Sequence, residues 1–358
     1  MDMSFRFVVL ALAVVACTAV TPPSLTITSP DGDIVDCINI NDQPAFDHPL
    51  LRNHTVLDAP AYLPDIAADT SWQVWHGNGT ECPKGTIPVR RLNETTGSQP
   101  GEEATLGHEY AIGMLNGPPL KIYGTKATFN VWHPKVEQAS EFSLAQVWIT
   151  SGSYENNTLN SIEAGWQTDA YTSPACYNLR CPGFVQTSRT VLVEGAITPA
   201  SAIGGLQTEL TIHIWKDPGR GPWWLGVGFS NGTNLSAIGY WPVEIFSNLT
   251  DHADDVQWGG EIVDNRALGR HTTTEMGSGY RPGSDRAAYV RDIQVAFRPR
   301  EFHPVSQLIV GATNSSYYSV EKYSNGSFSY GGPHRGAAVH IEFDMIFLYI
   351  CFVFLLFV

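Results

Sequence analysis

Apolar and polar residues alternate with a period of two in several stretches of the chain. Ala127–Trp132 and Leu210–Trp215 alternate in this way, and Phe142–Ile149 is apolar on both faces, as in a buried strand. The turn-like segment Lys216–Pro222 joins Leu210–Trp215 to Trp223–Phe229, a spacing that predicts a hairpin. No window of twelve or more residues carries a convincing helical stripe. The pattern therefore predicts an all-β fold, in which antiparallel sheets pack face to face as a sandwich.

The N-terminal part of the chain lacks these runs. From Thr21 to about Pro100 it is dense in Pro, Asp and His, which indicates a small, loop-rich unit held by a disulfide. The polar segment Leu92–Thr105 has no strand character and is the predicted domain boundary and nicking site. The predicted segments are a signal peptide over 1–19, the loop-rich unit with its link over 20–105, the β-sandwich domain over 106–335 and an apolar tail over 336–358.

Composition and charge narrow the class of protein. Only 16% of residues are charged, while 33 glycines and 23 prolines suit strands joined by many turns. The net charge of −14 argues against a nucleic-acid partner, because phosphate neutralisation needs clustered Lys and Arg. This balance fits a soluble extracellular protein.

The first 19 residues have the order of a secretory signal. Arg6 precedes the apolar run Phe7–Val15, and Cys17–Ala19 is a small-residue cleavage site. Asn-x-Ser/Thr sequons spread over turn-like segments support a glycosylated, secreted protein. The sequons lie at Asn53, Asn78, Asn93, Asn156, Asn231, Asn234, Asn248, Asn314 and Asn325.

The C-terminal tail is almost wholly apolar from Met345 to Val358. This run is too short to span a bilayer comfortably. It is interpreted either as the signal for a GPI anchor, with small residues upstream at Ser329–Gly332, or as an aberrant end of the gene model. A membrane is an expected partner only if the tail is such a signal.

Four cysteines remain once those in the signal and the tail are set aside. Three pairings of the four are formally open. Cys176 and Cys181 close a very small loop, and Cys37 and Cys82 form the natural second pair. No Cys/His spacing typical of a zinc site is present, so no metal is expected.

Two glutamates have similar surroundings. Glu261 directly follows Trp258-Gly259-Gly260, and Glu163 is followed closely by Gly165 and Trp166. Glycine allows backbone or substrate to approach closely, and a carboxyl beside an indole is open to desolvation. The two acids are therefore a candidate acid/base pair. The alternative interpretation is that both are strand-end residues on the surface.

The chain resembles the neprosin-type secreted plant proteins, in which an activation peptide precedes a glutamic-peptidase domain. The matching motifs follow one another over nearly the whole mature chain: Asp36-Cys37-Ile38, Gln43-Pro44-Ala45-Phe46, Cys82–Pro88, Ile162–Trp166, Cys176–Cys181, Gly183–Gln186, Trp223–Leu225, Ile238–Pro242, Trp258–Glu261 and His271–Gly279. The resemblance implies a β-sandwich endopeptidase that acts at acid pH, cleaves after proline, needs no cofactor and is made as a zymogen. It also implies that proline-containing peptides are the substrates and that the activation peptide is the inhibitor.

By the same resemblance, the catalytic glutamates are Glu163 and Glu261. Two carboxylates a few ångströms apart titrate as a coupled pair that holds one proton, so one member is expected to act as base and the other as acid. Proline specificity needs an apolar pocket for the pyrrolidine ring. The residues expected to line it are Trp166, Trp258, Gly259, Gly260, Tyr240 and Trp241, although Tyr240 and Trp241 also suit the core.

The chain departs from the family pattern beside Glu163. The family continues after Gly165-Trp166 through about one and a half strands, whereas here Gln167-Thr168 lead straight into Asp169–Tyr171. A strand next to Glu163 is therefore expected to be missing, which leaves an open edge. This gap favours a second hypothesis, a catalytically impaired or non-catalytic extracellular binding protein. A glycoside hydrolase is a third, since paired carboxylates also suit sugar chemistry.

Other polar residues have simpler interpretations. His213 alternates within a strand and is expected on a sheet face. His271 and Glu275 lie in a matching motif and are candidates for a supporting role in the cleft. Asp217-Pro218-Gly219 consists of residues that favour a turn and is interpreted as one.

Overall fold

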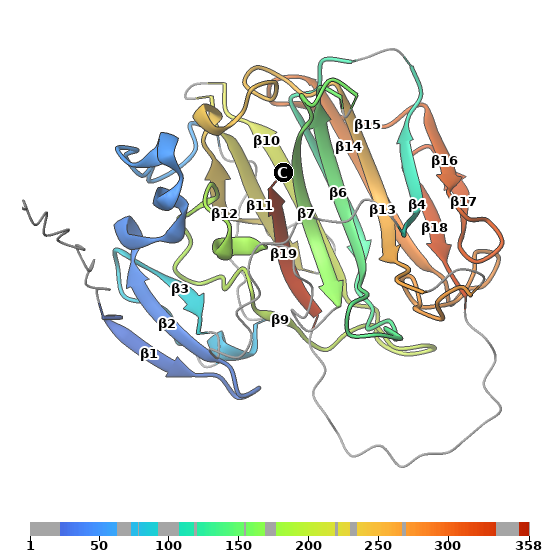
Figure 1. The fold of residues 1–358 in the computed structure, drawn as a ribbon, viewed down its shortest axis with the longest axis horizontal. Coiled ribbons are helices and arrows are strands. Elements are labelled where there is room, and N and C mark those ends of the chain that lie inside the picture. The colour runs from blue at the N-terminus through green and yellow to red at the C-terminus, as the bar shows by residue number, and fades with distance from the viewer. Residues whose placement is uncertain are drawn as a thin grey trace, which may run out of the picture.

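The protein is a sandwich of two antiparallel sheets with a smaller third sheet on its N-terminal side (Figure 1). The computed structural model describes residues 22–62, 73–77, 79–91, 107–117, 120–153, 155–168, 177–218, 221–229, 235–266 and 270–333 and the backbone of 351–357. The predicted signal peptide, the link and Cys176 lie outside these residues. Within the described part of the chain, no helix is both long and apolar enough to cross a membrane.

The first sheet of the sandwich has seven strands. Their order across the sheet is β16 (Leu308–Ala312), β4 (His108–Leu115), β13 (Asp255–Val263), β6 (Ser143–Ser151), β7 (Asn160–Thr168), β19 (Cys351–Phe357) and β9 (Ala196–Ile197). Every neighbouring pair is antiparallel. The predicted buried strand Phe142–Ile149 overlaps β6 from Ser143 onward, and β6 lies at the centre of this sheet.

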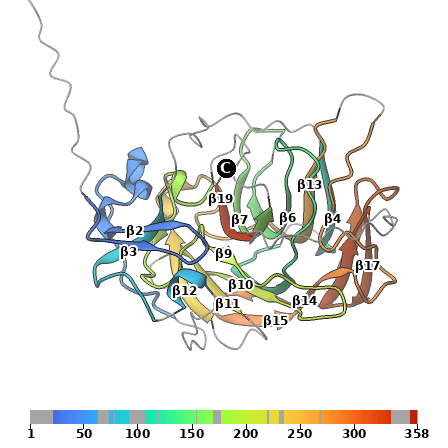
Figure 2. The ribbon, with the colours of Figure 1, turned by 90° about the horizontal axis from the view of Figure 1, so that it is seen from below.

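The second sheet has nine strands. Their order is β17 (Ser319–Ser324), β18 (Ser327–Gly331), β14 (Ala288–Arg298), β5 (Gly124–Asn130), β10 (Glu209–Lys216), β11 (Trp223–Phe229), β12 (Leu235–Trp241) and β8 (Val185–Gln186), with β15 (Glu301–Pro304) paired to β14. The predicted hairpin is confirmed: Leu210 pairs with Phe229, and across the turn the Asp217 backbone N–H donates to the Pro222 carbonyl while the Gly221 N–H donates to the Asp217 carbonyl. Figure 2 shows the two sheets as separate layers.

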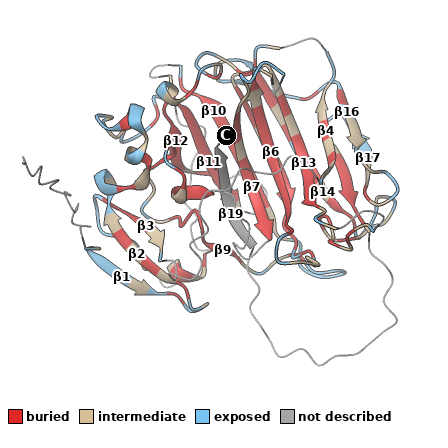
Figure 3. Cartoon of the chain, viewed as in Figure 1, coloured by how far each residue is buried: buried red, intermediate tan, exposed pale blue. Residues whose placement is uncertain are grey.

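Large apolar side chains fill the space between the layers. Figure 3 shows that much of the strands of both sheets is buried. Trp166 of β7 and Trp258 of β13 are fully buried there. The Trp166 indole N–H donates to the Asn130 carbonyl at 3.2 Å, and that of Trp258 donates to Thr125 Oγ1 at 3.1 Å. Because Asn130 and Thr125 belong to β5 of the other sheet, these bonds tie the layers together and satisfy the buried donors.

The N-terminal unit forms a three-stranded antiparallel sheet of β1 (Leu25–Thr28), β2 (Ile34–Asn39) and β3 (Thr86–Arg90). Short 3₁₀ helices follow β2 and precede β3, namely η1 (Ile40–Asp42), η2 (Pro44–Asp47), η3 (Pro49–Leu51) and η4 (Val74–His76). The predicted disulfide between Cys37 and Cys82 is present, so it links β2 to the loop before β3. Cys181 is also disulfide-bonded. Two more 3₁₀ helices, η6 (Asn178–Arg180) and η7 (Val243–Ile245), lie in the sandwich domain.

The expected gap beside Glu163 is occupied. Strand β19 from the apolar tail lies against the outer edge of β7, with Phe352 opposite Gln167 and Phe357 opposite Ile162 (Figure 1). The expectation of an open edge is therefore corrected, because backbone pairing is non-local and a strand from the far end of the chain completes the ladder. The tail, interpreted from the sequence either as the signal for a GPI anchor or as an aberrant end of the gene model, contributes strand β19 to this sheet.

Five of the predicted glycosylation sites lie in the described residues. Asn53, Asn156 and Asn325 are exposed. Asn248 and Asn314 are partly buried, and their side-chain amide nitrogens donate hydrogen bonds within the protein. The Asn156 amide nitrogen also donates, to Ser153 Oγ at 3.1 Å, so exposure is what distinguishes the three exposed sites, and they suit glycosylation better because a glycan needs room around the side chain. The sites outside the described residues are Asn78, Asn93, Asn231 and Asn234.

Candidate active site

Glu163 and Glu261 lie on the same face of the seven-stranded sheet. Glu163 of β7 stands opposite Trp148 of β6, and Glu261 of β13 stands opposite Leu144 of the same strand. Directly opposed residues share a face, and every second residue of a strand does too. The pair inferred from sequence is therefore brought to one surface, the face of the sheet turned away from the core.

Gln146 occupies the position between the two glutamates on β6. Its cross-strand neighbours are Gly165 on one side and Gly259 on the other. A Cβ added at Gly165 would lie 2.0 Å from the Ala145 carbonyl oxygen, so only glycine fits beside the neighbouring backbone there. No side chain from either glycine covers the Gln146 amide, which leaves the middle of the site to Gln146.

Two side chains of the described residues donate hydrogen bonds to the Glu163 carboxylate. Gln146 Nε2 donates to Oε2 at 2.8 Å, and Ser161 Oγ donates to Oε1 at 2.7 Å. Donors aimed at both oxygens favour the ionised form. The amide oxygen of Gln146 is buried and has no hydrogen-bond partner among the described residues. This oxygen is a ready acceptor for a small polar group bound beside Glu163.

Glu261 is 5% exposed, and one of its carboxylate oxygens contacts Nδ1 of His108. His108 is the first residue of β4 and follows closely after the predicted link. Sequence reasoning missed both His108 and Gln146. Gln146 carried a signal, because it is a polar residue inside an otherwise apolar strand; His108 carried none.

The strand register separates the two glutamates more than expected. They are two strands and four residues apart, which in a regular sheet with about 4.8 Å between strands and about 3.4 Å per residue puts their Cα atoms about 17 Å apart. The expectation of carboxylates only a few ångströms apart is revised accordingly.

The predicted substrate-binding tryptophans face the other way. Trp166 lies three residues after Glu163, and Trp258 lies three residues before Glu261. An odd separation along a strand places two side chains on opposite faces. Trp166 and Trp258 are consequently core residues, and a Cβ at Gly260 would also point into the core, against Tyr330 and Met276. The prediction that these three line a substrate pocket is corrected.

Tyr240 and Trp241 also lie away from the dyad. Trp241 is fully buried in the core between the sheets. Tyr240 is on the outer face of the nine-stranded sheet, where its hydroxyl contacts His54 Nε2 at 2.8 Å and accepts from the Leu57 backbone N–H at 2.9 Å. The predicted pocket role of both residues is corrected, since Trp241 packs in the core and Tyr240 holds the N-terminal unit. Gly259 alone of the predicted pocket residues lies on the dyad face.

The remaining candidates have structural partners. His213 packs against Trp215 and Phe302 on a sheet face, as predicted, and burial lowers its pKa to about 3. His271 Nε2 lies 3.0 Å from a Glu109 oxygen. Glu109, Asp264 and His271 each offer one atom that could bind a metal ion, and these atoms lie within 4.8 Å of one another. Glu275 Oε2 accepts from the Lys135 backbone N–H at 3.1 Å.

The N-terminal unit docks on the outer face of the nine-stranded sheet. Residues of the 44–62 segment pack against the aromatic side chains of Trp215, Trp224 and Tyr240. Two buried glutamines of the unit each form a reciprocal pair of hydrogen bonds with the backbone of the sandwich domain. Gln43 pairs with Gln186 at 2.7 and 3.1 Å, and Gln73 pairs with Leu192 at 2.7 Å in both directions. The amide side chains thus imitate the pairing of neighbouring strands.

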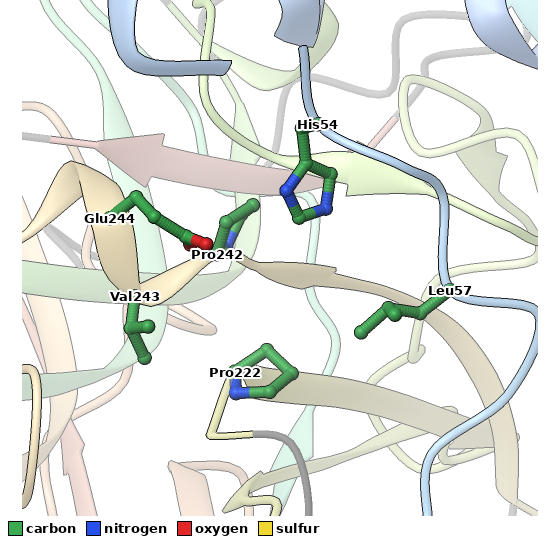
Figure 4. Close-up of a pocket in the computed structure, with 6 residues that line it drawn as sticks. All are labelled: His54, Leu57, Pro222, Pro242, Val243 and Glu244. Carbon is green, nitrogen blue, oxygen red and sulfur yellow. The ribbon is translucent and has the colours of Figure 1, made fainter.

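A cavity of about 310 Å³ lies at this docking interface (Figure 4). His54 and Leu57 of the N-terminal unit face Pro222, Pro242, Val243 and Glu244 of the sandwich domain. Burial lowers the pKa of His54, and the attraction of Glu244 opposes the shift. Because a lowered pKa disfavours the imidazolium, protonation of His54 weakens the docked arrangement.

The pKa values of two buried carboxyl groups near the interface are shifted upward, so acid acts on them in the opposite sense from His54. Burial raises the pKa of Glu194 to about 7 against the attraction of Arg180, and burial raises the pKa of Asp33 against its ion pair with Arg90. A raised carboxyl pKa means that the protonated form suits the folded surroundings better. Protonation of Glu194 and Asp33 on acidification therefore favours the folded state, although it discharges their ion pairs, whereas protonation of His54 disfavours the docked state.

Comparison with known proteins gives two family matches and several similar structures. A model of the Neprosin activation peptide matches residues 26–111, and a model of the Neprosin domain matches residues 166–333, which include Glu261 and begin three residues after Glu163. Scytalido-glutamic peptidase with a peptide-based transition-state analogue aligns with 63% of this chain and 97% of its own, at 12% identity and a TM-score of 0.36. SCP-B, a member of the Eqolisin family of peptidases in complex with the tripeptide Ala-Ile-His, aligns with 63% and 96% at 11% identity and a TM-score of 0.36.

Proposed function

Because the chain belongs to the neprosin family, in which an activation peptide precedes the catalytic domain, we propose that it is the secreted zymogen of a glutamic endopeptidase that acts at acid pH and cleaves after proline. Family membership supports a peptidase. The observation that carries the assignment of the site is the row formed by Glu163, Gln146 and Glu261 on one face of the seven-stranded sheet. The predicted signal peptide and the three exposed sequons support secretion.

Glu163 is the general base of the proposed mechanism. Its two hydrogen-bond donors favour the carboxylate, which is the form that takes a proton from water. A water held by the unpartnered oxygen of Gln146 would lie beside Glu163, with its second proton directed to Gln146. The water's oxygen then attacks the scissile carbonyl carbon, and the proton passes to Glu163.

Glu261 is the general acid. In its protonated form it donates a hydrogen bond to the scissile carbonyl oxygen and stabilises the tetrahedral intermediate. Glu261 then delivers its proton to the leaving nitrogen as the C–N bond breaks and the carbonyl re-forms, and the proton that Glu163 took from water is exchanged through solvent so that Glu261 is protonated again. The separation of the glutamates across β6 leaves room for the substrate backbone to lie over Gln146 between them.

Apolar side chains beside the dyad support a pocket for proline. Trp148 lies directly opposite Glu163 on the same face. Its ring packs edge-on against Tyr110, with centroids 6.1 Å apart, and the apolar cluster continues through Leu144 and Phe142. Aromatic and aliphatic walls of this kind suit a pyrrolidine ring. Trp148 and Tyr110 thus replace the core tryptophans as the residues proposed to contact proline.

Latency does not require the activation peptide to sit on the dyad. Its described residues dock on the opposite sheet, whereas His108, just after the link, contacts Glu261. We infer that the segment leading into β4 restrains Glu261 and that cleavage in the link releases it. Among the titrating interface groups discussed above, His54 is the one whose pKa shift favours release of the activation peptide in acid. Its pKa is lowered in the docked protein, so docking is favoured above the ordinary histidine pKa of about 6.5 and weakened below it.

The dyad is tested by Glu163→Gln and Glu261→Gln in the activated protein. Each change preserves size but removes the titrating group, so kcat/KM on a peptide with proline before the scissile bond is expected to fall by about 100-fold or more. Glu321→Gln on β17 is the matched control and should retain parental activity. A peptide with alanine in place of proline tests specificity. Activity within a few-fold of the parent, with an unchanged melting temperature, would remove that glutamate from the mechanism.

A further inference from the structure

The outer edge of β7 is paired with a strand from the far end of the chain. Six successive residues of β19, Phe352–Phe357, pair with Gln167–Ile162 in continuous antiparallel register. Leu356 stands opposite Glu163. Figures 1 and 2 show β19 inserted between β7 and β9 in the same layer. The strand that carries the proposed base is therefore held on one side by β6 and on the other by β19.

No nearer strand serves this edge in the described part of the chain. After β7, the next described elements are η6 and then β8, which belongs to the other sheet. Strand β9 has only two residues, and it pairs with β19 rather than with β7. Without β19, the outward N–H and C=O groups of Ile162–Gln167 would lack ladder partners among the described strands. Such an edge loses hydrogen-bond free energy and tends to pair with strands of other molecules.

The sequence of the tail suits this position. Cys351–Phe357 is a run of seven apolar residues without the alternation of a strand that faces water. Continuous apolar runs are typical of strands inside covered sheets. The connection over residues 334–350 can extend to about 60 Å at roughly 3.5 Å per residue.

We propose that the outer edge of β7 is a strand-acceptor site, that Cys351–Phe357 is its occupant, and that this main-chain pairing holds the Glu163 strand in place. Recognition is by β-strand addition, in which backbone hydrogen bonds supply the attachment. The tail then serves as a structural strand of the peptidase domain. Its removal, as in the processing of an anchor signal, would reopen the edge.

Two variants and one peptide test the proposal. A chain ending at Ile350 lacks the strand, and Phe354→Pro in the full chain removes one ladder N–H opposite Gly165 without shortening the protein. Phe354→Val is the matched control, because valine keeps the N–H and favours strands. The readouts are the melting temperature and hydrogen exchange of the β7 amides, which do not depend on peptidase activity. Failure of this proposal is therefore distinguishable from failure of the proposed function.

We expect the β7 amides to exchange at least about tenfold faster in the shortened chain and in Phe354→Pro, but not in Phe354→Val. A synthetic peptide of Cys351–Val358 with a lysine tag should restore protection to the shortened chain. Parental melting temperature and β7 protection in the shortened chain would overturn the proposal. A folded shortened chain whose β7 amides gain no protection from the peptide would also overturn it. If the shortened chain does not fold, exchange in Phe354→Pro decides: parental protection there overturns the proposal.

Discussion

The buried amide of Gln43 should control how tightly the activation peptide stays docked. Its side chain is 2% exposed and forms two hydrogen bonds with the backbone of Gln186, which is fully buried. Gln43→Leu keeps approximately the same volume but removes both bonds. The N–H and C=O of Gln186 are then buried without these partners in the docked state, whereas water can satisfy them once the peptide has left.

The magnitude follows from this count of groups. A buried polar group deprived of its partner costs about 1–3 kcal/mol, so two such groups weaken docking by about 2–4 kcal/mol after partial relaxation. Since about 1.4 kcal/mol corresponds to a factor of ten, the docking constant should fall by about 30- to 1000-fold. An amide does not titrate, so the loss should be equal at neutral and acid pH.

The assay measures retention of the peptide after the covalent connection is cut. A recognition sequence for a specific protease is placed between Gly97 and Ser98 in the link, and the cleaved protein is passed over a sizing column at neutral pH. The parental peptide should co-elute with the sandwich domain, and the Gln43→Leu peptide should separate from it. Gln207→Leu is the matched control, because the Gln207 side-chain nitrogen bonds within its own exposed loop.

Equal retention in the parent and in Gln43→Leu would refute the reasoning, because the paired amide bonds would then contribute nothing net to docking. Loss of retention only at acid pH would also contradict it. Gln73→Leu provides an independent repeat, since Gln73 makes the corresponding pair with Leu192 at the other end of the interface.

Two further predictions concern the site and its regulation. Gln146→Leu should lower kcat at least about tenfold with little change in KM, and the acid limb of the pH–rate profile should move to higher pH because the Glu163 carboxylate loses a donor; a parental profile would exclude Gln146 from the site chemistry. His54→Gln should make retention of the cleaved peptide less dependent on pH between about 5 and 7, since His54 protonation favours release; unchanged pH dependence on the sizing column would shift that role to other groups.

The sequence alone predicted the sandwich because strands and turns leave local marks. Period-two alternation in Leu210–Trp215 and the turn after it specified a hairpin that the structure contains. The same periodicity could have corrected one error. Trp166 and Trp258 are each three residues from a candidate glutamate, and that odd spacing already places them on the opposite face.

Only part of the candidate site could be predicted from the local sequence pattern. Local pattern and family resemblance identified Glu163 and Glu261, but neither reveals strand register. Register places Gln146 between them and sets their separation, because β6 is the common neighbour of β7 and β13. Register depends on contacts between residues far apart in sequence, so local reasoning could not supply it.

Pairing across long distances was decided only by the tertiary structure. A gap in the sequence after Trp166 indicated a missing strand, yet the sheet is completed by Cys351–Phe357. Backbone hydrogen bonds carry almost no information about which segment supplies them. The apolar character of the tail was therefore readable from the sequence, whereas its partner, and with it the support of Glu163, was determined by which edge the folded chain left unpaired.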